Sequence, residues 1–494
     1  MHKMKTKQLA AYFLAVASAS TVLAGLPQYV VVPLGDLPGG DFFSRAFDIN
    51  DRGMIVGSSK NLVDDLRQKA VRWTPGSTEP ELLSGQEGFD FSRASTVNNH
   101  GLIGGYNENE GSERQHAWLW DADNGLRFIF DDSVLGSRIA EVTNHGTAVG
   151  SYDSPDNGRG LHGYVLNLDT GDILTLDPIA PDGEQALTDD SNLFDLIVGT
   201  ASDTPDLPKP FKDAVTWSSG QSEANVLPGL FDFTDYQETK AAHVTNAGVI
   251  VGGAGNRNED GINFAQTENW IWDPGTQTAV SLGFLEGLDW TRVGDMNDDA
   301  TFLVGWAYPD GEVKPEFMPD HVGAVWTPST GWVDVNTLIA GGPAGYHISE
   351  LAGMNEAGEI VGTAINADGN FEAVLLRPSC LTLEVDNLVS GEEATFRVSH
   401  GTPGERTIVM AGLGGEPTTV IDLKGWCATF GFDIRLKKND IKITATGVFD
   451  GDGVFEAQRL VSDRNQGKNV LFQAAEQNTC PDECMSNIVE QVVQ

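Results

Sequence analysis

Basic residues are scarce in this chain, yet several of them recur at similar intervals. The sequence has 31 Lys and Arg against 71 Asp and Glu, which gives a formal net charge of −40. Five basic residues nevertheless stand at the start of five of the seven copies of one short phrase: Arg45, Arg93, Arg138, Lys240 and Arg292. Guanidinium and ammonium groups bind carboxylates and sulfates through charge-assisted hydrogen bonds, so these positions are candidates for an anion-binding site.

Aromatic residues precede three of these basic residues by two positions, with Ser or Thr between them: Phe43, Phe91 and Trp290. Aromatic faces could stack on sugar rings while the cations hold acidic groups, and the hypothesis is a partial basic ring for a carboxylated or sulfated polysaccharide. The structural alternative, which we favour, is that each basic residue pairs with an acid of the neighbouring repeat, the usual use of arginine among many carboxylates.

Motifs for catalysis are missing from the sequence. It contains no G-x-S-x-G elbow, Walker loop, HExxH or dinucleotide fingerprint, and these motifs are what the corresponding chemistries require. Asp and Glu are so abundant that no particular pair can be nominated as acid and base. We therefore assign no catalytic residue, no metal ligand and no cofactor. The high negative charge also argues against nucleic acid and membrane surfaces as partners.

The phrase that carries the basic residues occurs seven times. Its closing glycines are spaced 45 to 57 residues apart. The clearest copies are Arg45–Gly57, Arg93–Gly105, Arg138–Gly150, Lys240–Gly252 and Glu350–Gly362, and two degenerate copies end at Gly199 and Gly305. Each copy indicates a β-hairpin, because two strand-like runs flank an Asn-x-x-Gly turn or a close variant of it, and Asn and Gly tolerate a positive φ.

Further strand-like runs follow each hairpin, which makes four short strands per repeat. Four-stranded units of about 40–50 residues are typical of β-propeller blades. We therefore predict an all-β protein with a seven-bladed β-propeller over residues 25–378. A β-solenoid is the weaker alternative, since its coils are shorter and nothing here resembles a terminal cap. The recurring Trp residues are interpreted as packing between blades, with a sugar-stacking platform as the alternative.

The repeats resemble a known family. His116-Ala117-Trp118, and more loosely His162-Gly163-Tyr164, match the first half of the signature of HAF-type extracellular repeat proteins of bacteria, and Ala46–Gly57 matches the second half. The resemblance covers roughly residues 28–378. It implies a secreted, propeller-like repeat protein with no established catalytic residues. Copies three, four and six depart from the Asn-x-x-Gly turn, so their blades are expected to be less regular.

The two ends of the chain point to secretion. Residues 1–24 combine a basic start, a short apolar run and small residues before Gly25, which is the layout of a cleaved signal peptide. The apolar run is shorter than the roughly 20 residues of a membrane-spanning helix. The four cysteines lie in the last quarter of the chain, and an even set is typical of disulfides in an oxidising compartment: Cys380, Cys427, Cys480 and Cys484. Three pairings are possible. We lean toward Cys380 with Cys427 and Cys480 with Cys484.

The repeated phrase ends after Pro378, and a different residue pattern follows. Short alternating runs over residues 379–475 predict a small disulfide-bonded β-sandwich, and residues 476–494 form a Cys-containing tail. This tail resembles the ending of secreted planctomycete-type proteins.

The function expected from the sequence is non-catalytic binding or structural interaction, through propeller-face loops that contact an extracellular glycan or protein. The protein is expected to be a monomer, secreted to the extracellular space or the cell surface. The competing hypothesis is a polysaccharide lyase or glycosidase with its site at the axial end of the propeller. An enzyme should bring carboxylates, Tyr or His together at the axis, from blades that break the repeat symmetry. The sequence leaves the identity of the ligand open.

Overall fold

The computed structural model describes residues 26–38, 43–60, 67–110, 114–131, 134–153, 161–179, 185–202, 212–230, 238–257, 264–309, 321–379, 381–399, 404, 406–413, 419–421, 430–432, 442–450, 454–476 and 489–494. The expected signal peptide and all four cysteines, Cys380, Cys427, Cys480 and Cys484, lie outside the described residues.

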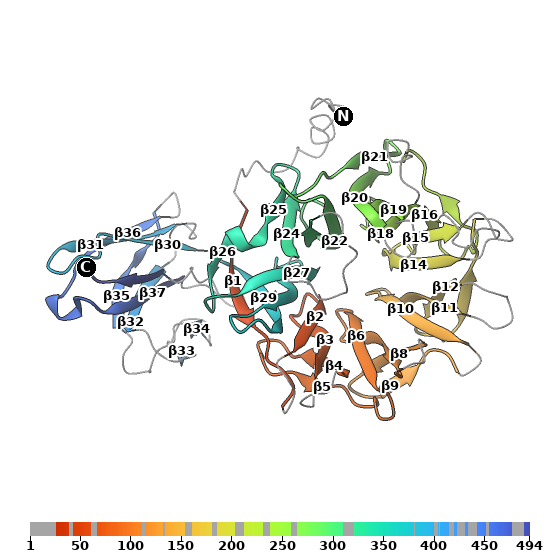
Figure 1. The fold of residues 1–494 in the computed structure, drawn as a ribbon, viewed down its shortest axis with the longest axis horizontal. Helices are drawn as coiled ribbons and strands as arrows, with labels where there is room; N and C mark the ends of the chain where they lie inside the picture. Colours follow the sequence, from red (N-terminus) through yellow and green to blue (C-terminus); the bar gives the residue numbers. More distant parts are fainter. Residues whose placement is uncertain are drawn as a thin grey trace. The chain divides into compact units, whose positions relative to one another are not determined.

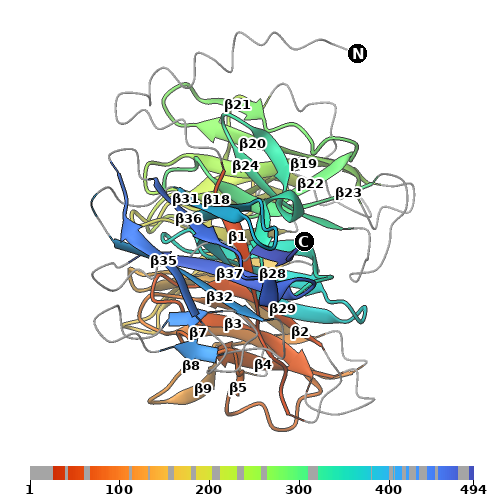
Figure 2. The ribbon, with the colours of Figure 1, turned by 90° about the vertical axis from the view of Figure 1, so that its left-hand side faces the viewer.

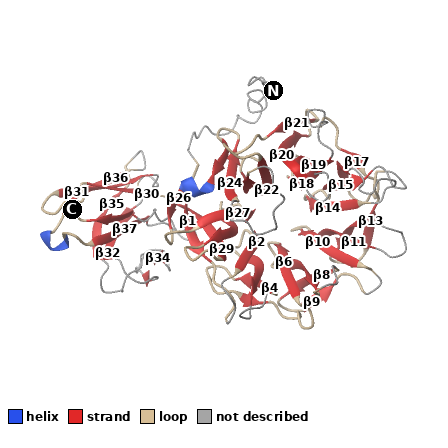
Figure 3. Ribbon diagram, viewed as in Figure 1, coloured by secondary structure: helices blue, strands red, loops and turns tan. Residues whose placement is uncertain are grey.

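The described chain is all-β. Its only helical elements are two short 3₁₀ turns, η3 (Val335–Leu338) and η4 (Asp463–Asn465), and everything else is strand or loop (Figure 3). Among the described residues, no helix is long and apolar enough to cross a membrane. The chain divides into two compact units, one formed by most of residues 33–375 and the other mainly by residues 376–494. The all-β prediction is therefore confirmed.

Six antiparallel four-stranded sheets follow one another along the first unit, and each pairs its strands in chain order. The first three consist of β2 (Ser44–Ile49), β3 (Ile55–Lys60), β4 (Gln68–Trp73) and β5 (Glu81–Leu82); β6 (Phe91–Val97), β7 (Ile103–Glu108), β8 (Gln115–Asp121) and β9 (Gly125–Phe128); and β10 (Gly136–Val142), β11 (Thr147–Asp153), β12 (Leu161–Asn167) and β13 (Ile173–Leu176). The next three consist of β14 (Ala186–Ser191), β15 (Ile197–Ser202), β16 (Lys212–Trp217) and β17 (Asn225–Val226); β18 (Glu238–Val244), β19 (Ile250–Arg257), β20 (Phe264–Asp273) and β21 (Thr278–Ser281); and β22 (Trp290–Met296), β23 (Leu303–Tyr308), β24 (Val322–Thr327) and β25 (Gly331–Asp334).

A five-stranded sheet completes the series and includes a strand from the start of the chain. Its order is β26 (Ile339–Gly341), β1 (Gln28–Pro33), β29 (Phe371–Ser379), β28 (Ile360–Ile365) and β27 (His347–Met354). We number these sheets 1 to 7 by their first strands β2, β6, β10, β14, β18, β22 and β27, and we call these the inner strands.

The sheets of the first unit form a ring (Figure 1). Each inner strand packs against strands of the preceding sheet, and β2 of sheet 1 packs against β27 and β28 of sheet 7. Figure 2 gives the view turned by 90° about the vertical axis. The first unit is thus a closed, propeller-like arrangement of short sheets, in which radial repetition leaves few free strand edges.

A β-bulge interrupts every inner strand at the same place in the repeat. In β2 the pairing with β3 shifts between Ala46 and Asp48, so Phe47 is the extra residue. The same shift recurs in the other six sheets. A bulge bends a strand and redirects the side chain that follows it.

The bulge explains why each copy of the phrase ends in glycine. A Cβ at Gly57 would lie 1.9 Å from the carbonyl oxygen of Arg45, and one at Gly305 would lie 1.9 Å from that of Arg292. A Cβ at each of the other closing glycines would lie 1.9 to 2.2 Å from the equivalent carbonyl oxygen. Backbone therefore occupies the space that any larger residue would need.

The turns between the first two strands keep one conformation even where the sequence degenerates. Gly53 has a φ of 77°, as expected for Asn-x-x-Gly. In copies four and six the same position is taken by Asp195 and Ala300, with φ of 53° and 51°. The departures that we noted in the sequence thus change the residue and not the turn, at the cost of left-handed backbone at non-glycine residues.

The recurring tryptophans are buried, as the packing interpretation predicts. Trp73, Trp118, Trp217 and Trp270 are fully enclosed, and Trp120, Trp272 and Trp326 are 5 to 7 % exposed. They belong to clusters that combine side chains of neighbouring sheets, such as Val56, Ala70, Trp118 and Trp120. Large aromatic side chains supply much of the apolar area that holds such sheets together.

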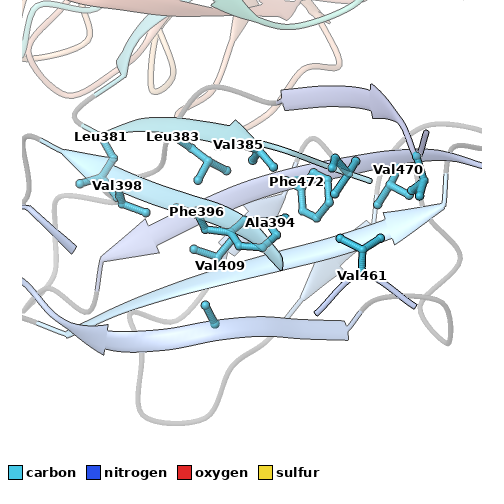
Figure 4. Packing of buried hydrophobic residues seen from close by; sticks show 14 of the residues in the cluster. Leu381, Leu383, Val385, Ala394, Phe396, Val398, Val409, Val461, Val470 and Phe472 are labelled. Carbon is cyan, nitrogen blue, oxygen red and sulfur yellow. The ribbon is translucent and has the colours of Figure 1, made fainter. Parts of the chain in front are cut away.

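The second unit has its own core. It contains a three-stranded sheet of β30 (Thr382–Asp386), β31 (Glu393–Ser399) and β36 (Phe455–Leu460), and a four-stranded sheet of β35 (Lys442–Val448), β32 (Arg406–Leu413), β37 (Asn469–Glu476) and β38 (Val489–Val492). A small sheet pairs β33 (Thr419–Ile421) with β34 (Phe430–Phe432). Leu383, Phe396, Val398, Val409 and Phe472 share one buried cluster drawn from both larger sheets (Figure 4).

Candidate acidic cavity

A cavity of about 550 Å³ lies where the inner strands and their turns meet, and all seven sheets contribute to its lining. Eight carboxylates line it: Asp48, Asp51, Glu141, Asp189, Asp190, Asp295, Asp298 and Glu356. Among the described residues, no Lys or Arg does so. The cavity is therefore a concentrated region of negative charge, and low-dielectric walls strengthen such a field.

Four of these carboxylates occupy one level, immediately after the bulge of their inner strand: Asp48, Glu141, Asp190 and Asp295. The equivalent residues of the other three sheets are Thr96, His243 and Gly353. Because the bulge redirects the side chain that follows it, this repeat position lines the cavity in five sheets, with the four carboxylates and His243. We call the four carboxylates the carboxylate ring.

The three aspartates of the carboxylate ring each join two sheets. Asp48 accepts from the backbone N–H of Ile49 at 2.7 Å and from that of Val97 in sheet 2, also at 2.7 Å. Asp190 does the same with Ser191 and with Val244 of sheet 5. Asp295 does so with Met296 and with Met354 of sheet 7. A carboxylate with two amide donors is firmly positioned.

Glu141 is held differently from the three aspartates. Its Oε2 accepts a hydrogen bond from the hydroxyl of Thr96 at 2.9 Å. Thr96 in turn accepts from the backbone N–H of Val142 at 3.3 Å, so threonine takes the connecting role of the aspartate in sheet 2. No backbone amide of the described residues donates to the Glu141 carboxylate, which leaves it the least neutralised member of the carboxylate ring.

Burial and mutual repulsion raise the pKa values of the carboxylate ring. Burial raises the pKa of Asp48 and of Asp190 to about 6, against the lowering effect of their amide donors. The pKa of Glu141 is raised well above its ordinary value by burial and by the charges of Asp48 and Asp190. Burial and the charge of Asp48 likewise raise the pKa of Asp295 well above its usual range. Like charges that share a desolvated site oppose one another's ionisation.

His243 does not offset this negative charge. Burial, together with the charge of Lys240, lowers its pKa to about 4, so its imidazole is neutral at pH 7. The carboxylate ring is consequently a set of four acids, and no positively charged side chain of the described cavity lining offsets their charge.

A second set of hydrogen bonds between neighbouring sheets is made by the residues that begin the turns, two positions after the position of the carboxylate ring in the repeat. The Asn50 side chain donates from Nδ2 to the carbonyl of Asn98 at 2.8 Å, and Asn98 donates to the carbonyl of Thr143 at 3.0 Å. Asn192 donates to the carbonyl of Thr245 at 2.9 Å. The Oδ1 of Asn50 meanwhile accepts from two amides of its own turn, so one side chain shapes the turn and connects it to the next sheet.

The basic residues predicted as a ring begin the inner strands, at the end away from the turns, and none of them lines the cavity. Arg45 pairs with Glu350 of sheet 7, and Lys240 pairs with Asp189 of sheet 4 at 2.7 Å. Both pairs join neighbouring sheets, which is the structural alternative that we favoured. Arg45 is largely buried and Lys240 is half exposed, so the two pairs differ in environment.

The other predicted residues have varied surroundings. The Arg93 guanidinium lies over the ring of Phe47 in sheet 1, 3.4 Å from its centroid, and Arg138 donates from Nε to Ser151 at 2.8 Å. Arg292 is exposed, and its charge opposes the effect of burial on the pKa of Tyr308, which is raised. Of the predicted aromatics, Phe43 and Trp290 are buried and Phe91 is half-buried. Buried faces of Phe43 and Trp290 do not offer open surfaces for a sugar.

Sequence reasoning missed the carboxylate ring, although a signal for it existed. Asp48, Glu141, Asp190 and Asp295 lie three positions after Arg45, Arg138, Leu187 and Arg292, so they recur in phase as the basic residues do. Their abundance elsewhere concealed this pattern. The four carboxylates of the ring do come together in one cavity, as the enzyme hypothesis requires, but they come from equivalent positions of the repeat.

The fold and the site together define an all-β, propeller-like protein with an acidic cavity at the centre of its sheets. No protein-family model and no curated protein matches the chain.

Solved structures provide distant similarities. An oligogalacturonate lyase from Vibrio parahaemolyticus is 8 % identical, with 71 % of this chain and 97 % of the lyase covered and a TM-score of 0.39. A prolyl endopeptidase is 8 % identical over 77 % of this chain, with a TM-score of 0.38, and the match spans 53 % of the endopeptidase. A putative TolB from Agrobacterium tumefaciens is 10 % identical, with 72 % and 100 % covered and a TM-score of 0.35. These similarities bear on neither activity nor ligand.

Proposed function

We propose that this chain is a secreted, non-catalytic binding protein that takes a cationic ligand into its acidic cavity. The observation that carries the proposal is the lining of eight carboxylates without a Lys or Arg among the described residues. A cation that enters the cavity would stabilise the ionised carboxylates, which burial and mutual repulsion now disfavour. The raised pKa values of Asp48 and Asp190 reflect this uncompensated negative charge.

The scaffold that we propose is a seven-bladed β-propeller of the HAF-repeat type, followed by a disulfide-bonded β-sandwich. The seven sheets that succeed one another in phase with the repeat support the blade number. The shared core of the two larger C-terminal sheets supports the sandwich. Secretion rests on the signal-peptide layout of residues 1–24 and on the even number of cysteines.

The proposal is tested by calorimetric titration of the full chain at pH 7.5 with spermine, with calcium and with a sulfated oligosaccharide. We expect spermine or calcium to bind and the anionic sugar not to bind. Glu141→Gln should weaken cation binding, because it removes a cavity charge without removing a backbone hydrogen bond. Glu223→Gln, an exposed acid outside the cavity, is the matched control. Binding of the sugar alone would contradict the proposal and support the basic residues as the site.

A polysaccharide-degrading enzyme is the second candidate, and one observation favours it. Glu141 has a pKa raised well above its ordinary value and no amide donor among the described residues, which are the properties of a general acid. Product release from a panel of neutral and anionic polysaccharides, abolished by Glu141→Gln, would establish catalysis. Absence of turnover with intact cation binding would leave the binding function as proposed.

A further inference from the structure

The mouth of the cavity is formed by the residues that follow the turn-initiating Asn or Thr of each sheet. All seven line the cavity: Asp51, Asn99, Asn144, Leu193, Asn246, Asp298 and Glu356. Six of them are polar, and several are linked from turn to turn, as where Asp51 N–H donates to Asn99 at 2.9 Å and Asn99 N–H donates to Asn144 at 2.6 Å. The exception is Leu193 in sheet 4.

Leu193 and its neighbour Phe194 form an exposed apolar pair at this rim. Leu193 is 53 % exposed and Phe194 is 71 % exposed. The turn itself is well ordered by its own contacts, since Asn192 Oδ1 accepts from the N–H of Phe194 at 2.9 Å and Leu193 N–H donates to Asn246 at 3.0 Å. Two large apolar side chains therefore extend into solvent from a hydrogen-bonded turn at the edge of a polar cavity, and such patches mark interaction sites.

The opposite side of the mouth is acidic. Asp298 N–H donates to Glu356 at 3.1 Å, and Glu356 N–H donates to Asp51 at 3.0 Å, so the turns of sheets 6, 7 and 1 bring three acids together. Partial burial and the neighbouring acids raise the pKa of Asp298 and of Glu356. Sheets 2 and 3 separate sheet 4 from sheet 1 in one direction, and sheets 5 and 6 separate it from sheet 7 in the other. The apolar pair thus faces the acidic sector across the ring.

We infer that the mouth binds an extended basic segment of a partner protein, with Lys or Arg side chains entering the acidic cavity and an apolar side chain covering Leu193 and Phe194. This inference rests on the proposed cation-binding function and specifies its ligand. A metal ion or a free polyamine offers no large apolar group for the exposed pair, whereas a polypeptide provides both chemistries a few residues apart. Charge complementarity brings the segment to the mouth, and apolar contact adds specificity.

Two fluorescent peptides test the inference on the full chain by anisotropy titration: a Lys-rich peptide with two leucines, and the same peptide with serines in their place. We expect the leucine peptide to bind more tightly. The double variant L193S/F194S should lower its affinity about tenfold, the scale for losing one or two partly buried apolar contacts, and should leave the serine peptide unaffected. The variant D298N/E356Q should weaken both peptides.

Val226→Ser is the matched control, because Val226 is 49 % exposed in the same sheet but does not line the cavity. Unchanged melting temperatures would show that the variants are folded. Equal binding of the two peptides, or an L193S/F194S variant that binds like wild type, would overturn the inference while spermine binding left the proposed function standing. Failure of the wild-type protein to bind either spermine or calcium would instead remove the proposed function itself.

Discussion

Asn355 donates a hydrogen bond from its Nδ2 to the backbone carbonyl of Asn50, 3.3 Å away and 305 positions earlier in the chain. The bond is buried and repeats the contact that Asn50 makes with Asn98 in the next sheet. The last repeat is therefore joined to the first by the same side chain and the same acceptor that join adjacent repeats. Closure of the ring uses the ordinary contact between neighbouring repeats, together with the strand β1 that adds to the last sheet.

The first prediction concerns this contact. Asn50→Ala should lower the free energy of unfolding by about 2–4 kcal/mol, because it removes two amide acceptor contacts and the buried bond to the Asn98 carbonyl, which keeps only the N–H of Gly101. Asn366→Ala is the control, since Asn366 accepts two amides of its own turn but donates within its own sheet. We expect a loss of only about 1 kcal/mol there in denaturant titration. Equal losses would show that the contact between sheets contributes nothing.

The second prediction concerns pH. A carboxyl whose pKa is raised in the folded state binds more protons there than in the unfolded chain, so the stability falls as pH rises through that window. For Asp48 and Asp190 the window runs from 3.8 to about 6, and for Glu141 it opens at 4.5. Glu141→Gln should therefore match wild type near pH 4 and be more stable than wild type at pH 7.5.

Thermal unfolding of wild type and Glu141→Gln across this pH range checks the second prediction. Glu223→Gln removes an equal charge from the surface and should show no such pH-dependent difference. A constant offset between Glu141→Gln and wild type at every pH would contradict the prediction, because titration of Glu141 would then not contribute to stability.

The third prediction concerns the closing glycines. Gly305→Ala should cost more than about 3 kcal/mol or prevent folding, since the new Cβ would lie 1.9 Å from the Arg292 carbonyl oxygen and backbone would have to move. Gly136→Ala should be tolerated, because its nearest neighbour would be 3.5 Å away. Yield of folded protein and the melting temperature distinguish the two variants, and similar behaviour would show that the bulge is more adaptable than its geometry indicates.

The fourth prediction compares two ion pairs that join neighbouring sheets. Glu350 accepts from Arg45 and from His321 Nδ1 at 3.0 Å, and although burial opposes it, these partners hold the pKa of Glu350 below its ordinary value. Arg45→Ala should cost about 3 kcal/mol because it removes the permanent charge that faces a largely buried carboxylate and leaves His321 as its partner. Lys240→Ala should cost less than about 1 kcal/mol, since Lys240 is 53 % exposed. Urea titration of both variants is decisive, and a larger loss for Lys240→Ala would refute the ranking.

Much of the fold could be predicted from the sequence, because the information was local. The Asn-x-x-Gly turns, the β-branched second strands and the Trp-containing third strands recur within one copy, so the hairpins between Arg45 and Gly57 or Lys240 and Gly252 could be placed directly. The way in which the ring closes could not be predicted, because it depends on the pairing of β1, near the start of the chain, with β29. Nothing near residues 28–33 indicates that pairing.

The candidate site was harder to predict for a different reason. The phase of the repeat places Arg45 and Asp48 equally well, but the bulge between Ala46 and Asp48 decides which of them faces the cavity. An extra residue in a strand reverses the alternation of apolar residues from that point onward, and the inner strands are too short after the bulge for the reversal to be recognised. The basic residues stood out by rarity, whereas the acids that line the cavity were hidden by their number.

The side chains that join the sheets reach main-chain atoms: Asn50 binds a carbonyl, and Asp48 binds an N–H. Main-chain atoms are the same whatever residue occupies the position. At these contacts a copy of the repeat can therefore change its own side chains while the donor or acceptor in the neighbouring sheet stays the same. The altered turn Asn192–Asp195 keeps such a contact, because Asn192 still donates to the carbonyl of Thr245.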